Sequence, residues 1–134
     1  MKKVLLDTNI LSAFMRGHET VIEKSRSYLQ VHEKFTMSII SYYEIMRGIK
    51  ALSNEKKYLM FQNFIYDCEL MDIDRSVADK AADIYHSLRK KGMLIEDADI
   101  LIAATAIIHD LNMATGNIKH FIRIEGLNLE NWLE

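Results

Sequence analysis

Short apolar runs alternate with helical segments along the chain, and this alternation limits the possible folds more than any other feature of the sequence. Val4-Leu5-Leu6 is continuously apolar, as expected for a strand buried on both faces of a parallel sheet, and polar turn residues follow it. Further strands are predicted at 35–39, 69–73 and 112–115, and residues 127–133 close the chain. Strands separated by helices need crossover connections. We therefore predict an α/β fold, a three-layer α/β/α sandwich around a central, mostly parallel sheet.

Helical spacing and end signals place the helices between these strands. Ser41 and Glu44 have the spacing of a capping box, which predicts a helix that opens at residue 41. The clearest helix has Asp74 as its cap, apolar residues at helical spacing and Gly92 at its end. Residues 98–109 are apolar almost all round, which indicates a central buried helix. The remaining helices are predicted at about 9–16, 18–33 and 54–67.

The composition is that of an ordinary globular chain. Its 134 residues are 49% hydrophobic and 27% charged, without proline, repeats or a change of composition, so we expect a single domain over residues 1–134. Asp7 interrupts the N-terminal apolar run after three residues, and no stretch reaches the roughly 20 apolar residues that span a bilayer. We expect a cytoplasmic protein without membrane contact. Cys68 has no disulfide partner and is predicted to be a small buried core residue.

The overall charge narrows the functional classes. A net charge of −2 and a pI of about 6.2 argue against a protein that coats nucleic acid, because such affinity comes from neutralising phosphates. The same charge is compatible with a nuclease, because bound divalent cations supply positive charge where the chain supplies carboxylates.

Acidic and amide residues stand at or shortly after the expected strand ends. Asp7 follows the first strand, Glu44 comes one helical turn after the second, and Asn117 follows the last. Asp99 lies in the first turn of the expected buried helix. Parallel topology brings such positions to one edge of the sheet, where ligands bind in this class of fold. Their oxygen ligands suit a hard cation, Mg²⁺ or Mn²⁺, and do not suit zinc.

Each of these residues has a plain structural alternative. Asp7 has the position of a helix cap, Glu44 fits the capping box, and Asp97 and Asp99 are favourable charges at a helix N-terminus. Residues i and i+2 of a helix point about 200° apart, so we expect Asp97 to cap and Asp99 to face the cleft. Asn117 suits a turn as well as a site. Carboxylates about 4 Å apart repel by roughly 4 kcal/mol at an effective dielectric near 20, which favours one cation-binding site over three unrelated caps.

Four segments together resemble, in order and spacing, the PIN-domain family, and in particular the VapC-type toxins of prokaryotic toxin–antitoxin pairs. They are Val4-Leu5-Leu6-Asp7-Thr8-Asn9, Ser41-Tyr42-Tyr43-Glu44-Ile45-Met46-Arg47-Gly48, Asp99-Ile100-Leu101-Ile102-Ala103-Ala104-Thr105-Ala106, and Thr115-Gly116-Asn117 with His120-Phe121. The resemblance spans nearly the whole chain. It implies a PIN-like fold and hydrolysis of RNA phosphodiester bonds, with Asp7, Glu44 and Asp99 as the acidic catalytic and metal-binding residues. It also implies Mg²⁺ as the ion (with Mn²⁺ able to substitute), a cognate antitoxin and a homodimer.

Two positions depart from the family pattern. The family often has a basic residue where Gly116 stands and a further acid where Asn117 stands, so we expect one tightly held ion. Thr115 and Asn117 are expected to hydrogen-bond a phosphate or a water, and Asp97 to support the site. The candidates for phosphate contacts are Arg16, Arg47, Lys119 and Arg123, with His120 near the cleft. Three residues of one helix are open to either an interface or the core: Tyr58, Met60 and Phe61.

Three other functions share parts of this pattern. A phosphoacceptor receiver domain needs an acid pair after its first strand, which supplies only Asp7, and an acceptor such as Asp72 or Asp74. A phosphatase of the D-x-D type needs a second acid where Asn9 stands. A catalytically inactive PIN scaffold that only binds a partner has no need of the three acids.

Overall fold

The computed structural model describes residues 1–134 and contains one five-stranded sheet. Its strands are β1 (Val4–Leu6), β2 (Thr36–Ser38), β3 (Glu69–Met71), β4 (Asn112–Thr115) and β5 (Leu129–Asn131). Their order in the sheet is β3-β2-β1-β4-β5, and every neighbouring pair is parallel. The predicted α/β sandwich is confirmed, with a sheet that is parallel throughout.

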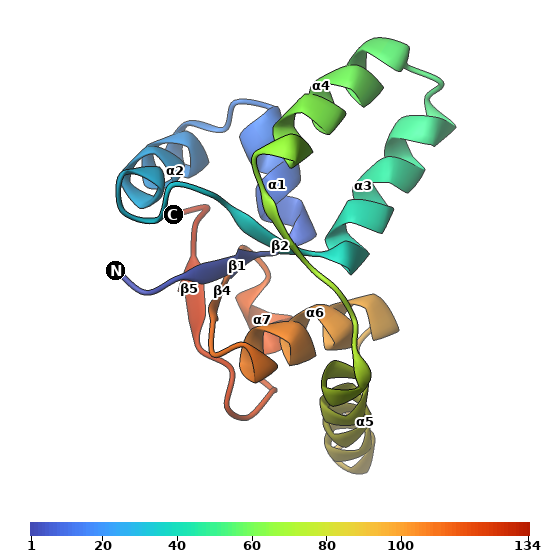
Figure 1. Cartoon of the computed structure of the whole chain (residues 1–134). Helices are drawn as coiled ribbons and strands as arrows, with labels where there is room; N and C mark the ends of the chain where they lie inside the picture. The colour runs from blue at the N-terminus through green and yellow to red at the C-terminus, as the bar shows by residue number, and fades with distance from the viewer.

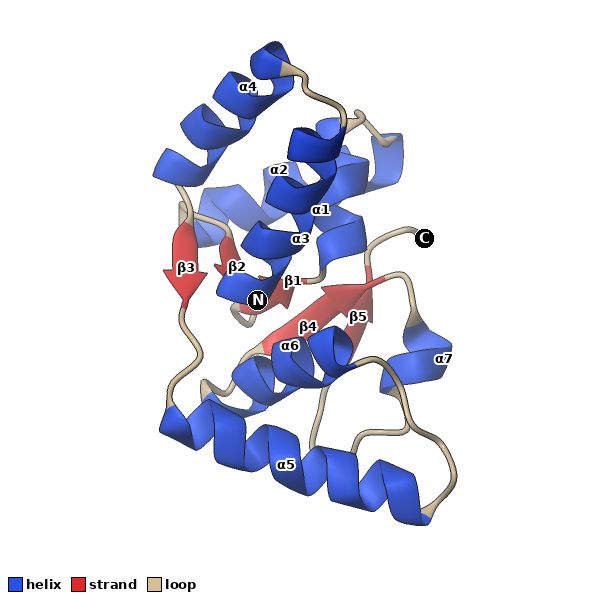
Figure 2. Ribbon diagram, turned by 90° about the vertical axis from the view of Figure 1, so that its right-hand side faces the viewer, coloured by secondary structure: helices blue, strands red, loops and turns tan.

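Seven helices cover the two faces of the sheet. They are α1 (Thr8–Met15), α2 (Glu19–His32), α3 (Ile39–Ala51), α4 (Glu55–Tyr66), α5 (Arg75–Lys90), α6 (Asp97–Ile108) and α7 (Ile118–Phe121). Helices α1 to α4 lie on one side of the sheet, and α5, α6 and α7 lie on the other (Figures 1 and 2). The short helix α7 was not indicated by the sequence patterns, and the closing segment 127–133, which was given no secondary structure there, contains strand β5.

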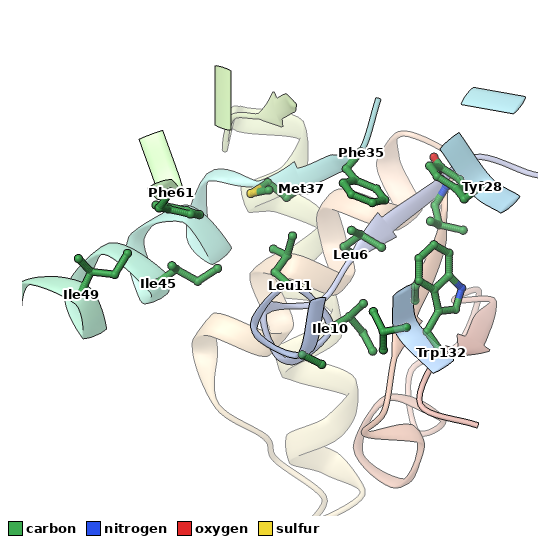
Figure 3. Packing of buried hydrophobic residues seen from close by; sticks show 14 residues of the cluster. Leu6, Ile10, Leu11, Tyr28, Phe35, Met37, Ile45, Ile49, Phe61 and Trp132 are labelled. Atoms are coloured by element: carbon green, nitrogen blue, oxygen red, sulfur yellow. The ribbon is translucent and has the colours of Figure 1, made fainter. Parts of the chain in front are cut away.

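Two hydrophobic cores hold these layers together, one on each face of the sheet. The first packs β1 and β2 against α1 to α4 and Trp132 (Figure 3). The second packs Leu5 and Met113 against α5, α6 and Phe121. Val4 and Leu6 belong to the first core and Leu5 to the second, which is the alternation expected of a strand covered on both faces. This explains why the run is apolar without interruption.

Helix α6 has the central position that its composition predicts. Ala103, Ala104 and Ala106 are fully buried, and the helix packs against both α5 and β4. Asp74 caps α5, with its carboxylate accepting from the Val77 N–H at 3.0 Å. That role explains Asp74 without an acceptor function of the kind a receiver domain needs.

Two predicted helix caps are wrong. Helix α3 begins directly after β2 at Ile39, and Ser38 caps it by accepting from the Ile40 N–H at 3.0 Å. Ser41 therefore lies buried inside the helix, and the predicted capping box with Glu44 does not form. Asp97 does not cap α6, because Glu96 takes the cap position and no side chain there bonds the helix N-terminus.

Other predictions of burial hold in part. Cys68 is half-buried at the margin of the first core, and burial raises the pKa of its thiol to about 11. On α4, Phe61 is a core residue, whereas Tyr58 and Met60 are exposed. None of the helices combines the length and the apolar character that crossing a membrane requires.

The strand order reverses at the centre of the sheet. From β1 the chain builds outward through β2 to β3, and then returns to place β4 and β5 on the other side of β1. The carboxyl ends of β1 and β4 therefore flank the reversal point, where open parallel sheets bind their ligands. The residues that follow these two strands are Asp7 and Gly116, next to Thr115 at the end of β4.

Candidate active site

Asp7 lies at the carboxyl end of β1 and is 4% exposed. One carboxylate oxygen, Oδ1, accepts from the Thr8 N–H at 2.8 Å, so Asp7 also caps α1. The other, Oδ2, accepts from the Thr115 hydroxyl at 2.8 Å, across 108 residues of sequence. Burial raises the pKa of Asp7, the two hydrogen bonds lower it, and the nearby charge of Glu44 raises it again. The two interpretations of Asp7, as cap and as site residue, are therefore compatible.

Glu44 reaches the same region from α3. Its Oε1 accepts from the Thr8 hydroxyl at 2.7 Å, and the Thr8 and Ser41 hydroxyl oxygens are 2.9 Å apart. A hydroxyl carries one proton, so when Thr8 donates to Glu44, the Ser41 hydroxyl must donate to Thr8. Thr8 and Ser41 thus orient the carboxylate of Glu44. Neither was predicted as a site residue, although Thr8 directly follows Asp7 in sequence.

Asp99 enters from the third element, the first turn of α6. Its pKa is raised to about 6, first by burial and then by the charges of Asp7, Glu44 and Glu96, while His120 lowers it. The structure therefore brings Asp7, Glu44 and Asp99 within electrostatic reach of one another, from β1, α3 and α6. Helices α3 and α6 contact each other beside this site.

No basic side chain neutralises these three acids by an ion pair. The ion pairs of the chain are Lys2–Asp110, Lys3–Glu69 and Lys91–Glu125, all away from the site. No three His, Cys, Asp or Glu side chains converge closely enough to ligate one ion directly. Mg²⁺ is commonly held by one or two carboxylates and completes its shell with water. An excess of negative charge on hard oxygen donors fits such an ion.

Thr115 and Asn117 connect β4 to the same site. The Asn117 N–H donates to the Thr115 hydroxyl oxygen at 2.9 Å, and Thr115 in turn donates to Asp7. Asn117 contacts His120 through its side chain, 2.8 Å from Nδ1. A Cβ added at Gly116 would lie 2.1 Å from Leu133 Cδ1, so a side chain there would have to displace that leucine.

The remaining sequence-predicted residues do not join the acids. Arg47 stacks over the Tyr43 ring at 5.2 Å on the exposed face of α3. Arg123 donates to the Met93 carbonyl, and Arg16 and Lys119 are exposed and form no ion pair. Asp97 is exposed and lines an apolar hollow between α5 and α6. This position agrees with the expectation that Asp97 and Asp99 point in different directions.

Comparison with known proteins identifies the family. The family model of the PIN domain matches residues 4–127. Ribonuclease VapC1 of Methanocaldococcus jannaschii is 33% identical over 128 residues, which cover 96% of this chain and 85% of the relative. The tRNA(fMet)-specific endonuclease VapC of Salmonella typhimurium is 29% identical, covering 98% and 99%. A chain in the crystal structure of VapBC2 from Rickettsia felis bound to a promoter DNA fragment superposes with a TM-score of 0.87 at 28% identity, covering 96% and 98%.

The fold and this match define the class: the chain belongs to the PIN-domain family. Within that family its relatives are ribonucleases of the VapC type, the group that the four sequence segments resemble.

Proposed function

We propose that this chain is a divalent-metal-dependent endoribonuclease and the toxin of a toxin–antitoxin pair. The observation that carries the proposal is that Asp7, Glu44 and Asp99 lie within electrostatic reach of one another at the carboxyl edge of a parallel sheet, and that no ion pair neutralises them. The names of the VapC relatives add the substrate class, RNA. The whole chain, residues 1–134, would act as one domain.

Asp7 and Asp99 would hold one Mg²⁺ or Mn²⁺, directly or through water, and Glu44 would complete the acidic pocket. Each Asp7 oxygen accepts one hydrogen bond, and a carboxylate oxygen has a second lone pair for a cation or its water. When bound, the cation supplies Lewis acidity that neutralises charge on phosphoryl oxygens and lowers the pKa of water.

The protein groups would orient the attacking water. Thr8 binds Oε1 of Glu44, which leaves Oε2 free to accept a hydrogen bond and a proton from that water. Asp99 is the alternative proton acceptor, because it lies in the same pocket. Thr115 would keep the Asp7 carboxylate at a fixed angle, since it donates to Oδ2 and receives the Asn117 N–H.

The proposed partners follow from the relatives. Chains of VapBC complexes superpose on this chain with TM-scores of 0.87 and 0.85, which supports a small cognate antitoxin as the binding partner. A homodimer and a cytoplasmic location complete the proposal, together with one ion per site, because an amide stands at Asn117.

The test is RNA cleavage by the purified protein, followed by mapping of the new 5′ ends. We expect cleavage with Mg²⁺ or Mn²⁺, none with a chelator, and a loss of at least about 100-fold in Asp7→Asn and Asp99→Asn. Asp7→Asn should fold, because an amide oxygen can still accept from Thr8 and the change removes a buried charge. Full activity of Asp7→Asn would contradict the mechanism, and an inert wild type would favour the scaffold that only binds a partner.

A further inference from the structure

Asn117 and His120 form a side-chain pair beside the acidic site. Asn117 Nδ2 lies 2.8 Å from His120 Nδ1. Asn117 stands at the cap position of α7 but makes no side-chain bond to the helix backbone. An asparagine at a helix cap ordinarily uses its side chain for that backbone. Here the amide is used for the histidine ring.

This pair is tied to the buried end of β1 by a continuous chain of hydrogen bonds. His120 contacts the Asn117 side chain, the Asn117 N–H donates to Thr115, and Thr115 donates to Asp7. The ring is itself exposed, so it is held in place from the protein side and open on the solvent side. When the ring is neutral and Asn117 Nδ2 donates, Nδ1 accepts and the ring proton is on Nε2; when the ring is protonated, Nε2 carries a proton as well.

His120 also lies within electrostatic reach of this acidic site, because the charge of the protonated ring lowers the pKa of Asp99. The charges that influence the pKa of Asp99 come from three acids and from His120, and no lysine or arginine is among them. For Asp7 the acting charge is that of Glu44. A phosphate group that approaches the three acids therefore also comes close to the exposed ring of His120.

We propose that His120 binds a phosphate group of the RNA, donating from Nε2 to a phosphate oxygen, and that Asn117 positions the ring for this contact. The inference rests on the proposed ribonuclease function and adds a substrate-binding residue to it. The competing interpretation is that His120 is an ordinary basic residue in the last turn of α7, which predicts no effect on RNA.

The experiment compares four variants with the wild type. His120→Ala removes the donor, His120→Gln keeps an amide donor, Asn117→Ala frees the ring, and His109→Ala is the control. His109 is an exposed histidine at the opposite end of α6 from Asp99. The readouts are KM and kcat for a single-stranded RNA with Mg²⁺, RNA affinity by fluorescence anisotropy in chelator, and the Mg²⁺-induced shift of the thermal midpoint.

We expect His120→Ala to weaken RNA affinity and raise KM about tenfold, the effect of one hydrogen bond to a charged group. His120→Gln should recover most of this loss, Asn117→Ala should lose about threefold, and His109→Ala should match the wild type. The Mg²⁺-induced shift should stay unchanged in His120→Ala.

If the wild type cleaves RNA and Asp7→Asn does not, the proposed function stands. Two results would then overturn the inference about His120 alone. One is wild-type RNA affinity and KM in His120→Ala. The other is a lost Mg²⁺-induced shift in that variant, because the ring would then act on the ion. A wild type that neither binds nor cleaves RNA would overturn both the inference and the proposed function.

Discussion

At the scale of single residues, the site depends on a carboxylate that water barely reaches. Asp7 is stabilised by two short hydrogen bonds, from the Thr8 N–H and the Thr115 hydroxyl, yet its pKa remains raised. Hydrogen bonding therefore compensates only part of the cost of burying the charge. A nearby cation would supply the remainder, which links the local structure of Asp7 to the proposed function.

Asp99 gives the clearest dependence on pH. The pKa of Asp99 is raised to about 6 in the folded state, from the ordinary value of 3.8 that applies to the unfolded chain. The folded state therefore holds the proton more tightly than the unfolded chain does. Its contribution to stability is complete below about pH 4 and is lost as the pH rises through about 6. Without metal, Asp99→Asn should then be more stable than the wild type at pH 7.5 and equal to it near pH 4.

Because Asp99 is half-exposed, solvent screening reduces the expected gain to about 1 kcal/mol, or about 3 °C in thermal midpoint. Thermal unfolding in chelator at pH 4 and pH 7.5 measures it, with the exposed Asp97→Asn as the matched control two residues away. Equal midpoints for Asp99→Asn and wild type at pH 7.5 would contradict the electrostatic account of the site.

At the scale of elements, the caps show where sequence patterns mislead. Ser41-Tyr42-Tyr43-Glu44 has capping-box spacing, but the cap of α3 is Ser38, three residues earlier, at the end of β2. No turn residue separates β2 from α3, so the local sequence gives no signal for where the strand ends and the helix begins. Ser41 and Glu44 instead face Thr8 of α1, a contact across at least 33 residues that no helical pattern encodes.

This difference predicts which serine stabilises α3. Ser38→Ala should lower the free energy of unfolding by about 1 kcal/mol, the usual cost of removing an N-cap. Ser41→Ala should cost less than half as much, because Thr8 can still donate to Glu44. Chemical denaturation of both variants measures the order of the two losses. A larger loss in Ser41→Ala would restore the capping-box interpretation.

At the scale of the whole molecule, much of the fold could be predicted from the sequence. The apolar run at Val4–Leu6 and the all-round apolar helix near Ala103 require cover on both sides, and crossover connections then require a parallel sheet. The order of the strands was not readable in this way, because it depends on pairings between distant segments. The bond from Thr115 to Asp7 shows this most clearly, since it joins residues 108 apart.

The candidate site, too, could be predicted from the sequence only in part. Asp7, Glu44 and Asp99 could be selected from their positions near strand ends and a helix start, and the fold brings them within electrostatic reach. The residues that orient these acids could not be selected from the sequence, because they act only through contacts made in the folded molecule. They are Thr8, Ser41 and the Asn117–His120 pair. The two cores lie on either side of the sheet and leave this edge for polar groups.

The central claim is that acids from β1, α3 and α6 form one cation site, and thermal unfolding with added Mg²⁺ or Mn²⁺ tests it most directly. An ion at ten times its Kd stabilises the folded state by about 1.4 kcal/mol, so the midpoint of the wild type and of Asp97→Asn should rise by a few degrees. Asp7→Asn and Asp99→Asn should show little or no rise. No rise in the wild type at millimolar ion, or equal rises in Asp97→Asn and Asp99→Asn, would contradict the account.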